Sequence, residues 1–97
     1  MAMHNPPHPG EFIRATYIDP FDISVRSLAE SLGVASSTLA RIVSTRSGVS
    51  PEMALRLSKA LGRSAESWLA MQRNFDLWQA KKTADLSAVQ KVQFEAA

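Results

Sequence analysis

The chain has 97 residues, no cysteine and a formal net charge of +2 at pH 7. This length suits one domain with a single modest core, which the 45% of hydrophobic residues can supply. The absence of cysteine excludes a disulfide framework and a thiolate metal site. No apolar run approaches the roughly 20 residues of a membrane span, and the N-terminus lacks the apolar segment of a signal peptide. We therefore expect a cytoplasmic protein without a membrane partner.

The basic residues are concentrated in the middle of the chain. Residues 24–63 hold six lysines and arginines against two acidic residues, whereas the remainder holds five against seven. A positive segment of this kind is what contact with DNA phosphates requires.

The N-terminal residues 1–9 are predicted to form an irregular arm, because their three prolines remove backbone donors and disfavour helix at the preceding residue. A short helix is predicted from Gly10 to Ile18, with Ile13, Thr16 and Tyr17 on one face. The sequence Asp19-Pro20 ends it, since proline cannot continue the hydrogen-bond ladder.

A metal site can be imagined at the same end of the chain, where His4, His8 and Glu11 are closely spaced. Pro6 and Pro7 prevent the helix that would bring the two histidines onto one face. We therefore expect no metal and no other cofactor, and interpret the histidines as part of the arm or as a cap for the first helix.

Residues 24–44 have the pattern of a helix, a sharp turn and a second helix. Ser24 is a suitable N-cap, and Gly33 stands where left-handed backbone angles are needed after the first helix. Ala29 is small where two crossing helices would touch. The second helix is predicted from Ser36 to Ser44, and this pattern is typical of the helix-turn-helix, whose second helix enters the major groove of DNA.

Two further helices are predicted after a loop at residues 45–49. The first begins at Pro51 and is stopped by Gly62, and the second runs from Ala65 towards Ala80. The sequence thus predicts an all-α fold with five helices, a domain at residues 10–80 and a C-terminal extension at residues 81–97. Apolar residues recur every three positions in this extension, which indicates either a weak amphipathic helix or a frayed tail.

The candidate DNA-binding residues follow from the helix-turn-helix pattern. Hydroxyl groups at the start of the second helix can donate to and accept from phosphates and base edges. Arg41 can bind guanine bidentately or hold a phosphate, and Arg26 and Arg46 flank the groove and hold the DNA backbone. The hydroxyl residues are Ser36, Ser37 and Thr38.

The last helix is richer in aromatic residues than a short helix usually needs. We assign Trp68 to the core and the rest of the row to a dimer interface, because domains of this kind read two half-sites about 34 Å apart. The predicted interface residues are Leu69, Gln72, Phe75, Asp76 and Trp78.

No pattern of catalytic residues is present, so we expect no enzyme activity. The serines have no histidine in a predicted helix to activate them, and there is no glycine-rich phosphate loop.

Five segments resemble the HigA-type antitoxins, over about residues 8–80. They are His8-Pro9-Gly10-Glu11, residues 28–34, residues 48–57, residues 68–72 and residues 75–78. The resemblance implies a phage-repressor-like, dimeric repressor encoded beside a HigB-like, mRNA-cleaving toxin. Such a protein neutralises the toxin and binds its own operator DNA. The alternatives are a free-standing transcriptional regulator and a protein-interaction module without DNA binding.

Three residues depart from the family pattern. Ala35 occupies the cap before the second helix of the motif, so that Ser36 takes over the cap or the helix starts late. Thr45 is unfavourable where a glycine would adopt positive φ, which predicts a different path for the loop. Ser47 replaces a basic residue, which predicts weaker phosphate binding.

Overall fold

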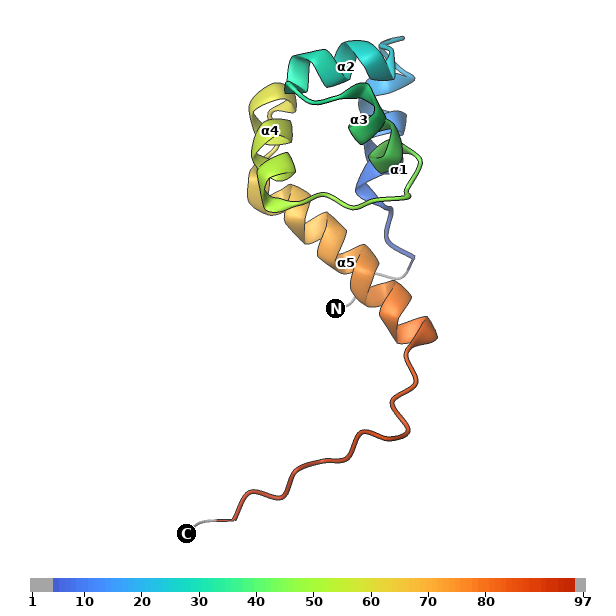
Figure 1. Ribbon diagram of the computed structural model, residues 1–97, viewed down its shortest axis with the longest axis vertical. Helices are drawn as coiled ribbons and strands as arrows, with labels where there is room; N and C mark the ends of the chain where they lie inside the picture. The colour runs from blue at the N-terminus through green and yellow to red at the C-terminus, as the bar shows by residue number, and fades with distance from the viewer. Residues whose placement is uncertain (1–4, 96–97) are drawn as a thin grey trace.

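A computed structural model describes residues 5–95, and in this part of the chain it contains five α-helices and no β-strand (Figure 1). The predicted all-α, five-helix fold is confirmed. The first four helices and the beginning of α5 surround a common core, and the rest of α5 projects beyond it (Figure 1). The principal extents of 60 × 27 × 25 Å reflect this projection and the tail that follows it.

The first helix differs from the prediction in its second half. After α1 (Pro9–Ile13), the chain forms a π-helical turn, η1 (Arg14–Ile18), in which the Asp19 amide donates to the Arg14 carbonyl over 2.9 Å. Because this hydrogen bond joins residues five apart, Ile13 and Ile18 come onto one face, and both are buried. Ile18 therefore joins Ile13 in the core, while Thr16 and Tyr17 are half-buried.

The helix-turn-helix consists of α2 (Val25–Leu32) and α3 (Ser36–Val43). Ser24 caps α2, because its hydroxyl accepts a hydrogen bond from the Ser27 amide over 3.0 Å. Gly33 ends α2 with a φ of 72°, as the turn requires.

The last two helices are α4 (Pro51–Leu61) and α5 (Ala65–Thr83), and each begins at a serine that accepts a hydrogen bond from the third residue along. Helix α5 runs three residues beyond the predicted end at Ala80. The following residues 84–95 contain no helix, so the weak amphipathic helix proposed for this segment is not formed there.

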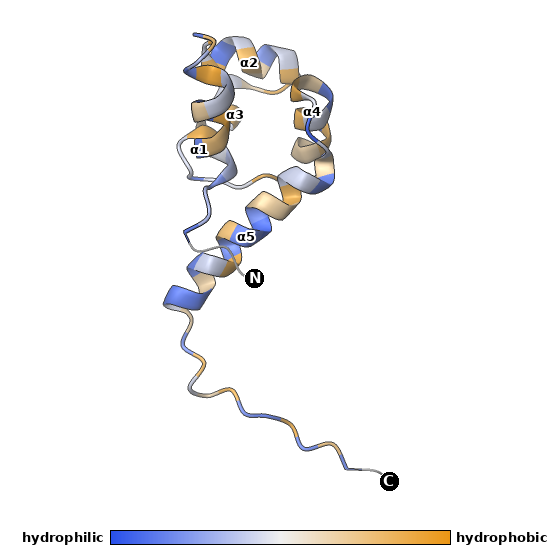
Figure 2. Ribbon diagram, turned by 180° about the vertical axis from the view of Figure 1, so that it is seen from behind, coloured by the Kyte–Doolittle hydropathy of each residue, from blue (hydrophilic) through white to orange (hydrophobic). Residues whose placement is uncertain are grey.

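The core lies between the faces of all five helices. Trp68 is fully buried, as predicted, and packs beside Ile13, Leu39 and Leu57, which are also fully buried. In Figure 2 each helix carries both apolar and polar residues, the pattern expected when one side of a helix packs on a core.

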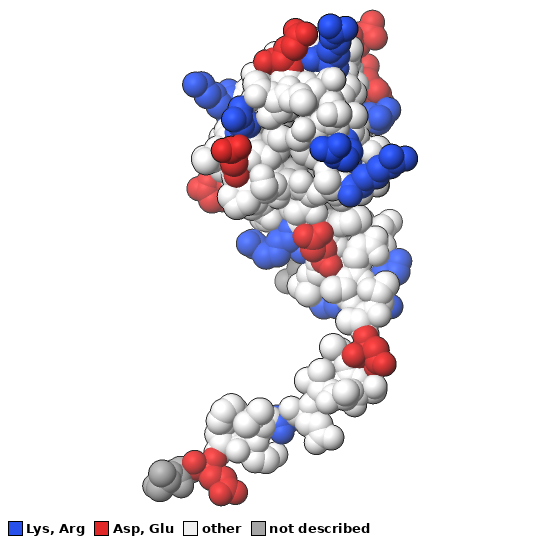
Figure 3. Space-filling model, in the orientation of Figure 1, with Lys and Arg blue, Asp and Glu red and all other residues white. Residues whose placement is uncertain are grey.

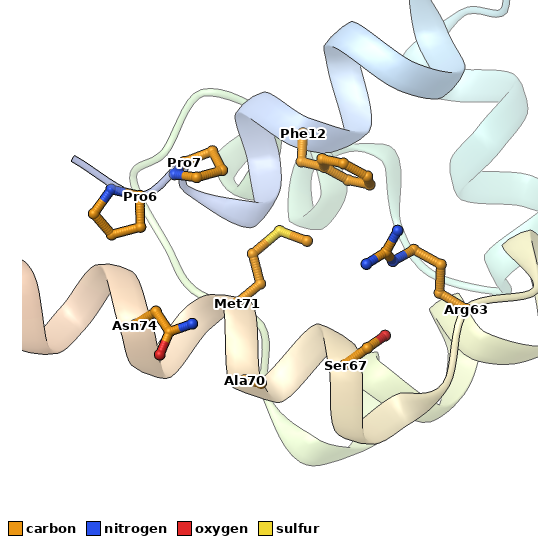
Figure 4. A pocket seen from close by; sticks show the side chains of 8 residues that line it. All are labelled: Pro6, Pro7, Phe12, Arg63, Ser67, Ala70, Met71 and Asn74. Atoms are coloured by element: carbon orange, nitrogen blue, oxygen red, sulfur yellow. The ribbon is translucent and has the colours of Figure 1, made fainter. Parts of the chain in front are cut away.

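Residues 5–8 of the N-terminal arm are irregular, and several of them pack against the domain. Pro6 is buried, and Pro7 is half-buried. Together with Phe12 and Met71 they line a pocket between the arm and α5, towards which the Arg63 guanidinium points (Figure 4). The same guanidinium lies 4.8 Å from the centre of the Phe12 ring, a distance suited to cation–π attraction.

Candidate nucleic-acid interface

The outer face of α3 is formed by small and polar side chains. Ser36, Ser37 and Arg41 are exposed, whereas Thr38 is half-buried at the edge of this face. Ala40 and Ser44 are also exposed and complete the face. Sequence reasoning missed these two residues, although Ala40 lies three residues after Ser37 and Ser44 three residues after Arg41, a spacing that indicates the same side of a helix.

The three candidate arginines, Arg26, Arg41 and Arg46, are exposed. Arg26 forms a solvent-exposed ion pair with Glu30, at 3.8 Å between Nε and a carboxylate oxygen. Within residues 5–95 no ion pair involves Arg41 or Arg46. Figure 3 shows basic side chains gathered on the side of the domain where α3 lies, which is the charge distribution that phosphate contacts need.

The start of α3 differs from both expectations for Ala35. The helix begins at Ser36 with Ala35 itself at the N-cap, and no side chain caps it. The serine does not take over, and the helix does not start late. A backbone hydrogen bond takes the place of the side-chain cap for one amide of the first turn, since the Thr38 amide donates to the Ala35 carbonyl over 3.0 Å.

The loop after α3 corrects the prediction for Thr45. Thr45 does adopt positive φ, at 67°. The Arg46 amide donates to the Arg41 carbonyl over 2.8 Å, and the Thr45 amide donates to the Ile42 carbonyl over 3.0 Å. These two bonds form a Schellman motif, which satisfies the last carbonyl groups of the helix and holds Thr45 in the strained conformation.

Helix α1 supports the recognition helix at the same end. A Cβ atom on Gly10 would overlap the Ile42 carbonyl oxygen and lie 2.7 Å from the carbonyl carbon. Only glycine allows this approach of two backbones. Gly10, which belongs to the His8-Pro9-Gly10-Glu11 segment, therefore has a direct role in positioning α3.

Arg56 of α4 holds the turn between α2 and α3. Its Nη1 donates to the Leu32 carbonyl over 2.9 Å and to the Gly33 carbonyl over 3.3 Å. Glu52 lies 3.7 Å from the Arg56 Nε. Arg56 was not predicted as a functional residue, and sequence gives no signal for a contact that spans more than twenty residues.

Gln72 of α5 holds the loop that follows α3. Its carboxamide oxygen accepts a hydrogen bond from the Val49 amide over 2.9 Å, and its nitrogen donates to Asp76 over 2.9 Å. A Cβ on Gly48 would lie 2.9 Å from the carboxamide carbon of Gln72. The buried amide of Gln72 therefore ties α5 to the loop.

His8 caps α1 and is buried with 2% of its surface exposed. Its Nδ1 accepts a hydrogen bond from the Gly10 amide over 2.9 Å, so this nitrogen carries no proton. Burial lowers the pKa of the imidazole, and the carboxylates of Glu11 and Asp76 oppose this effect. Two roles were predicted for the histidines, part of the arm or a cap for the first helix, and His8 forms the cap.

The predicted dimer residues lie on two different sides of α5. Leu69, Gln72 and Asp76 line an open groove together with Arg73, Leu77 and Ala80. Phe75 and Trp78 lie roughly opposite, at 3.6 residues per turn. The Phe75 ring packs edge-on against His8, 4.9 Å between ring centroids, and the Trp78 ring lies 6.5 Å from Phe75.

Residues 5–95 contain no group of three His, Cys, Asp or Glu side chains able to hold a metal ion. The imagined ligand His4 lies outside the described residues. None of the described helices is both long and apolar enough to cross a membrane.

Comparison with known proteins places the helices in a family. A helix-turn-helix family model matches residues 15–68. The structure of antitoxin GraA in complex with its operator is 39% identical, and the alignment covers 100% of this chain and 97% of that chain with a TM-score of 0.81. A structure of Pseudomonas aeruginosa antitoxin HigA with the higBA promoter is 32% identical, covers 92% and 97% and has a TM-score of 0.82. Antitoxin HigA-1 of Vibrio cholerae is 32% identical over 72 residues, which are 74% of this chain and 68% of that protein.

This chain belongs to the HigA-type antitoxins of the helix-turn-helix family. The resemblance carried by the His8-Pro9-Gly10-Glu11 and Trp68-to-Trp78 segments is thereby confirmed. In this HigA-type chain the two segments meet, since His8 packs against Phe75. Gly10 of the first segment also packs against Ile42 of α3. The family match also includes a regulator of Escherichia coli K12, YddM, which is described as an uncharacterised transcriptional regulator and is 35% identical over 92 residues.

Proposed function

We propose that this HigA-type chain is a cytoplasmic repressor that binds its own operator as a homodimer and neutralises a HigB-like toxin by binding it, without catalysis. The observation that carries the proposal is the exposed face of α3, with Arg41 at its centre. It is held at one end by Gly10 and Thr45 and at the other by Arg56. Alignment of the whole chain with the structure of antitoxin GraA in complex with its operator supports operator binding by this chain.

Each candidate residue has a place in this proposal. Ser36, Ser37 and Arg41 would approach base edges, and Thr38 would approach a phosphate from the edge of the face. Arg26 and Arg46 would hold the DNA backbone on either side of the groove. Exposed Ala40 adds an apolar contact suited to a thymine methyl group.

Gel shift of the purified full chain tests the DNA half. A duplex from the region upstream of its own gene is compared with a scrambled duplex of equal length at physiological salt. We expect the upstream duplex to bind at least ~10³-fold more tightly, the usual lower limit for specific over non-specific binding. Equal affinity for the two duplexes would contradict the repressor proposal and favour the interaction module.

The toxin half is tested by co-expression with the neighbouring gene product. A HigB-like toxin should co-purify with the chain in a complex that survives salt, and growth inhibition by the toxin should be relieved. Specific operator binding without any neighbouring toxin gene would identify a free-standing regulator instead.

A further inference from the structure

A pocket lies between the N-terminal arm, α1 and the first half of α5 (Figure 4). Its volume of about 380 Å³ falls in the lower part of the range of small-molecule sites, about 300–1,000 Å³. A mostly apolar wall with a few polar groups is the usual form of such a site. The apolar wall residues are all buried or half-buried, and they are Pro6, Pro7, Phe12, Ala70 and Met71.

Arg63 supplies the only charge among the described residues that line this pocket. Its guanidinium points into the pocket from the turn before α5 (Figure 4). The guanidinium carbon lies 4.8 Å from the centre of the Phe12 ring and 5.8 Å from that of the Trp68 ring. Within residues 5–95 Arg63 forms no ion pair. Stacking on an aromatic ring engages the face of a guanidinium, so its N–H edge is left for an anion.

Two uncharged polar side chains, Ser67 and Asn74, lie at opposite ends of the pocket (Figure 4). Ser67 is beside Arg63, but its hydroxyl already donates to the Ser64 carbonyl over 2.7 Å. Asn74 lies at the end formed by the prolines of the arm. The cation and the apolar wall therefore define a ligand with one negative charge at the Arg63 end and an apolar body that extends towards the arm.

We propose that this pocket binds a small apolar monocarboxylate, with the carboxylate on the Arg63 guanidinium and the apolar body between Phe12, Met71 and the arm. A carboxylate matches the planar guanidinium through two parallel hydrogen bonds. Met71 suits the apolar part, because its unbranched, polarisable side chain adapts to irregular shapes and contacts aromatic rings favourably. None of the lining residues belongs to α3, so the site is separate from the proposed DNA-binding face.

Three probes separate the parts of the proposed ligand, and each is added to the purified full chain at neutral pH. Phenylacetate carries the ring and the charge, phenylacetamide carries the ring alone, and acetate carries the charge alone. We expect phenylacetate to bind with a dissociation constant of about 1 mM or below, which a ligand of about ten non-hydrogen atoms can reach. The amide should bind at least ~5-fold more weakly, because it loses the ion pair. Acetate should bind at least ~10-fold more weakly, because it buries no ring.

Methyl signals in NMR spectra of the chain labelled at alanine and methionine locate the site. Phenylacetate should shift the signals of Ala70 and Met71 and leave that of Ala80, which is exposed near the end of α5, in place. Shifts confined to residues outside the pocket would overturn the proposal. The absence of any shift at about 10 mM phenylacetate would overturn it as well.

Two substitutions test the two halves of the contact. R63Q should weaken phenylacetate binding at least ~5-fold and leave the affinity for phenylacetamide unchanged, since only the ion pair is lost. R73Q removes an exposed arginine of α5 that lies outside this pocket, and as the matched control it should bind phenylacetate as the parent does. An R63Q variant with the parent's affinity for phenylacetate would overturn the proposal.

A70L fills the pocket with a larger side chain and should abolish binding of both phenylacetate and phenylacetamide. Circular dichroism checks that this variant is folded, and R63Q decides alone if it is not. A folded A70L variant that binds phenylacetate as the parent does would place the ligand elsewhere and overturn the proposal.

The tail of the chain is the other occupant to be tested, because Phe94 and Glu95 also combine a ring with a carboxylate. Phe94 is 91% exposed and has no packing partner to lose. If the tail competed for the pocket, F94A would bind phenylacetate more tightly than the parent, and this result would overturn the small-molecule site. We expect equal affinities. All of these measurements are made without DNA or toxin, so their outcome is independent of the proposed repressor and antitoxin functions.

Discussion

Single residues decide how α3 can meet DNA. Arg41 is exposed on the outer face of α3, with no ion pair among the described residues to compete for its guanidinium. Thr45 ends the same helix in a backbone conformation that β-branched residues rarely adopt. In the proposed complex Arg41 would contact the DNA, and Thr45 fixes the direction of the chain after α3.

Replacing Arg41 by alanine should weaken operator binding by about 1–3 kcal/mol and relax base preference at one position of each half-site, because a bidentate contact would be lost. Fluorescence anisotropy with single-base variants of the operator measures both effects. K91A, which removes a basic residue outside the helices, is the control and should bind as the parent does. A uniform loss across all sequences would mean that Arg41 contacts only a phosphate.

Replacing Thr45 by glycine should raise the free energy of unfolding by about 1 kcal/mol. Glycine relieves a left-handed conformation that costs an L-residue about 1–2 kcal/mol, and part of this gain is offset by the greater freedom of the unfolded chain. Urea unfolding measures the change. An unchanged or lower midpoint for T45G would show that the Thr45 side chain makes a compensating contact.

Two contacts connect α5 to the rest of the domain. His8 caps α1 and packs on Phe75 of α5, and Gln72 of α5 holds the Val49 amide after α3. Helix α5 thus positions both the first helix and the loop behind the recognition helix.

The His8 cap makes stability depend on pH. Because the folded pKa is lowered, the folded state binds fewer protons than the unfolded state, whose histidine titrates near about 6.5. The contribution of His8 is therefore complete above about pH 6.5 and is lost progressively as the pH falls below it. Thermal unfolding at several pH values should show this loss in the parent and less of it in H8N, which retains a cap acceptor but does not titrate. An equal slope in H8N would assign the pH dependence to other groups.

Replacing Gln72 by leucine should cost about 1–3 kcal/mol of unfolding free energy, because the buried Val49 amide loses its acceptor. The effect should reach DNA binding, since the loop after α3 is no longer held. Amide hydrogen exchange at residues 45–49 measures the loosening directly. N74L, a substitution at an exposed position of the same helix, is the control. Unchanged exchange in Q72L would mean that the loop is held by its own turns.

At the scale of the whole molecule, the proposed homodimer would read its operator with two copies held at a fixed separation. A helix-turn-helix dimer reads half-sites one DNA turn apart, about 34 Å between centres. Within each copy, the hydrogen bond from the Val49 amide to Gln72 links the loop after α3 to α5.

Insertion of about 5 base pairs between the half-sites should therefore reduce operator affinity towards the non-specific level, since it rotates one half-site to the opposite side of the duplex. Insertion of a full turn of about 10 base pairs keeps the rotational phase and should bind only if the connection between copies can stretch. Gel shift with the two spaced operators measures the difference. Equal affinity for the natural and the 5-base-pair spacing would show that each copy binds independently.

Local patterns were sufficient to predict every α-helix and most helix ends. Serine caps, Pro51 and the glycines at the ends of α2 and α4 act through hydrogen bonds and backbone angles within one turn. The burial of Trp68 followed from helical periodicity in the same way. The exposed face of α3 was also accessible to this reasoning, apart from Ala40 and Ser44.

The sequence by itself therefore determined the helices, the helix-turn-helix and the family resemblance, because these depend on residues within a few positions of one another. Tertiary structure decided the approach of Gly10 to Ile42, the turn contact of Arg56, and the packing of one side of α5 against His8. Each of these depends on a backbone or side chain brought from a distant segment. Spacing along the chain carries no information about such contacts until the helices are packed.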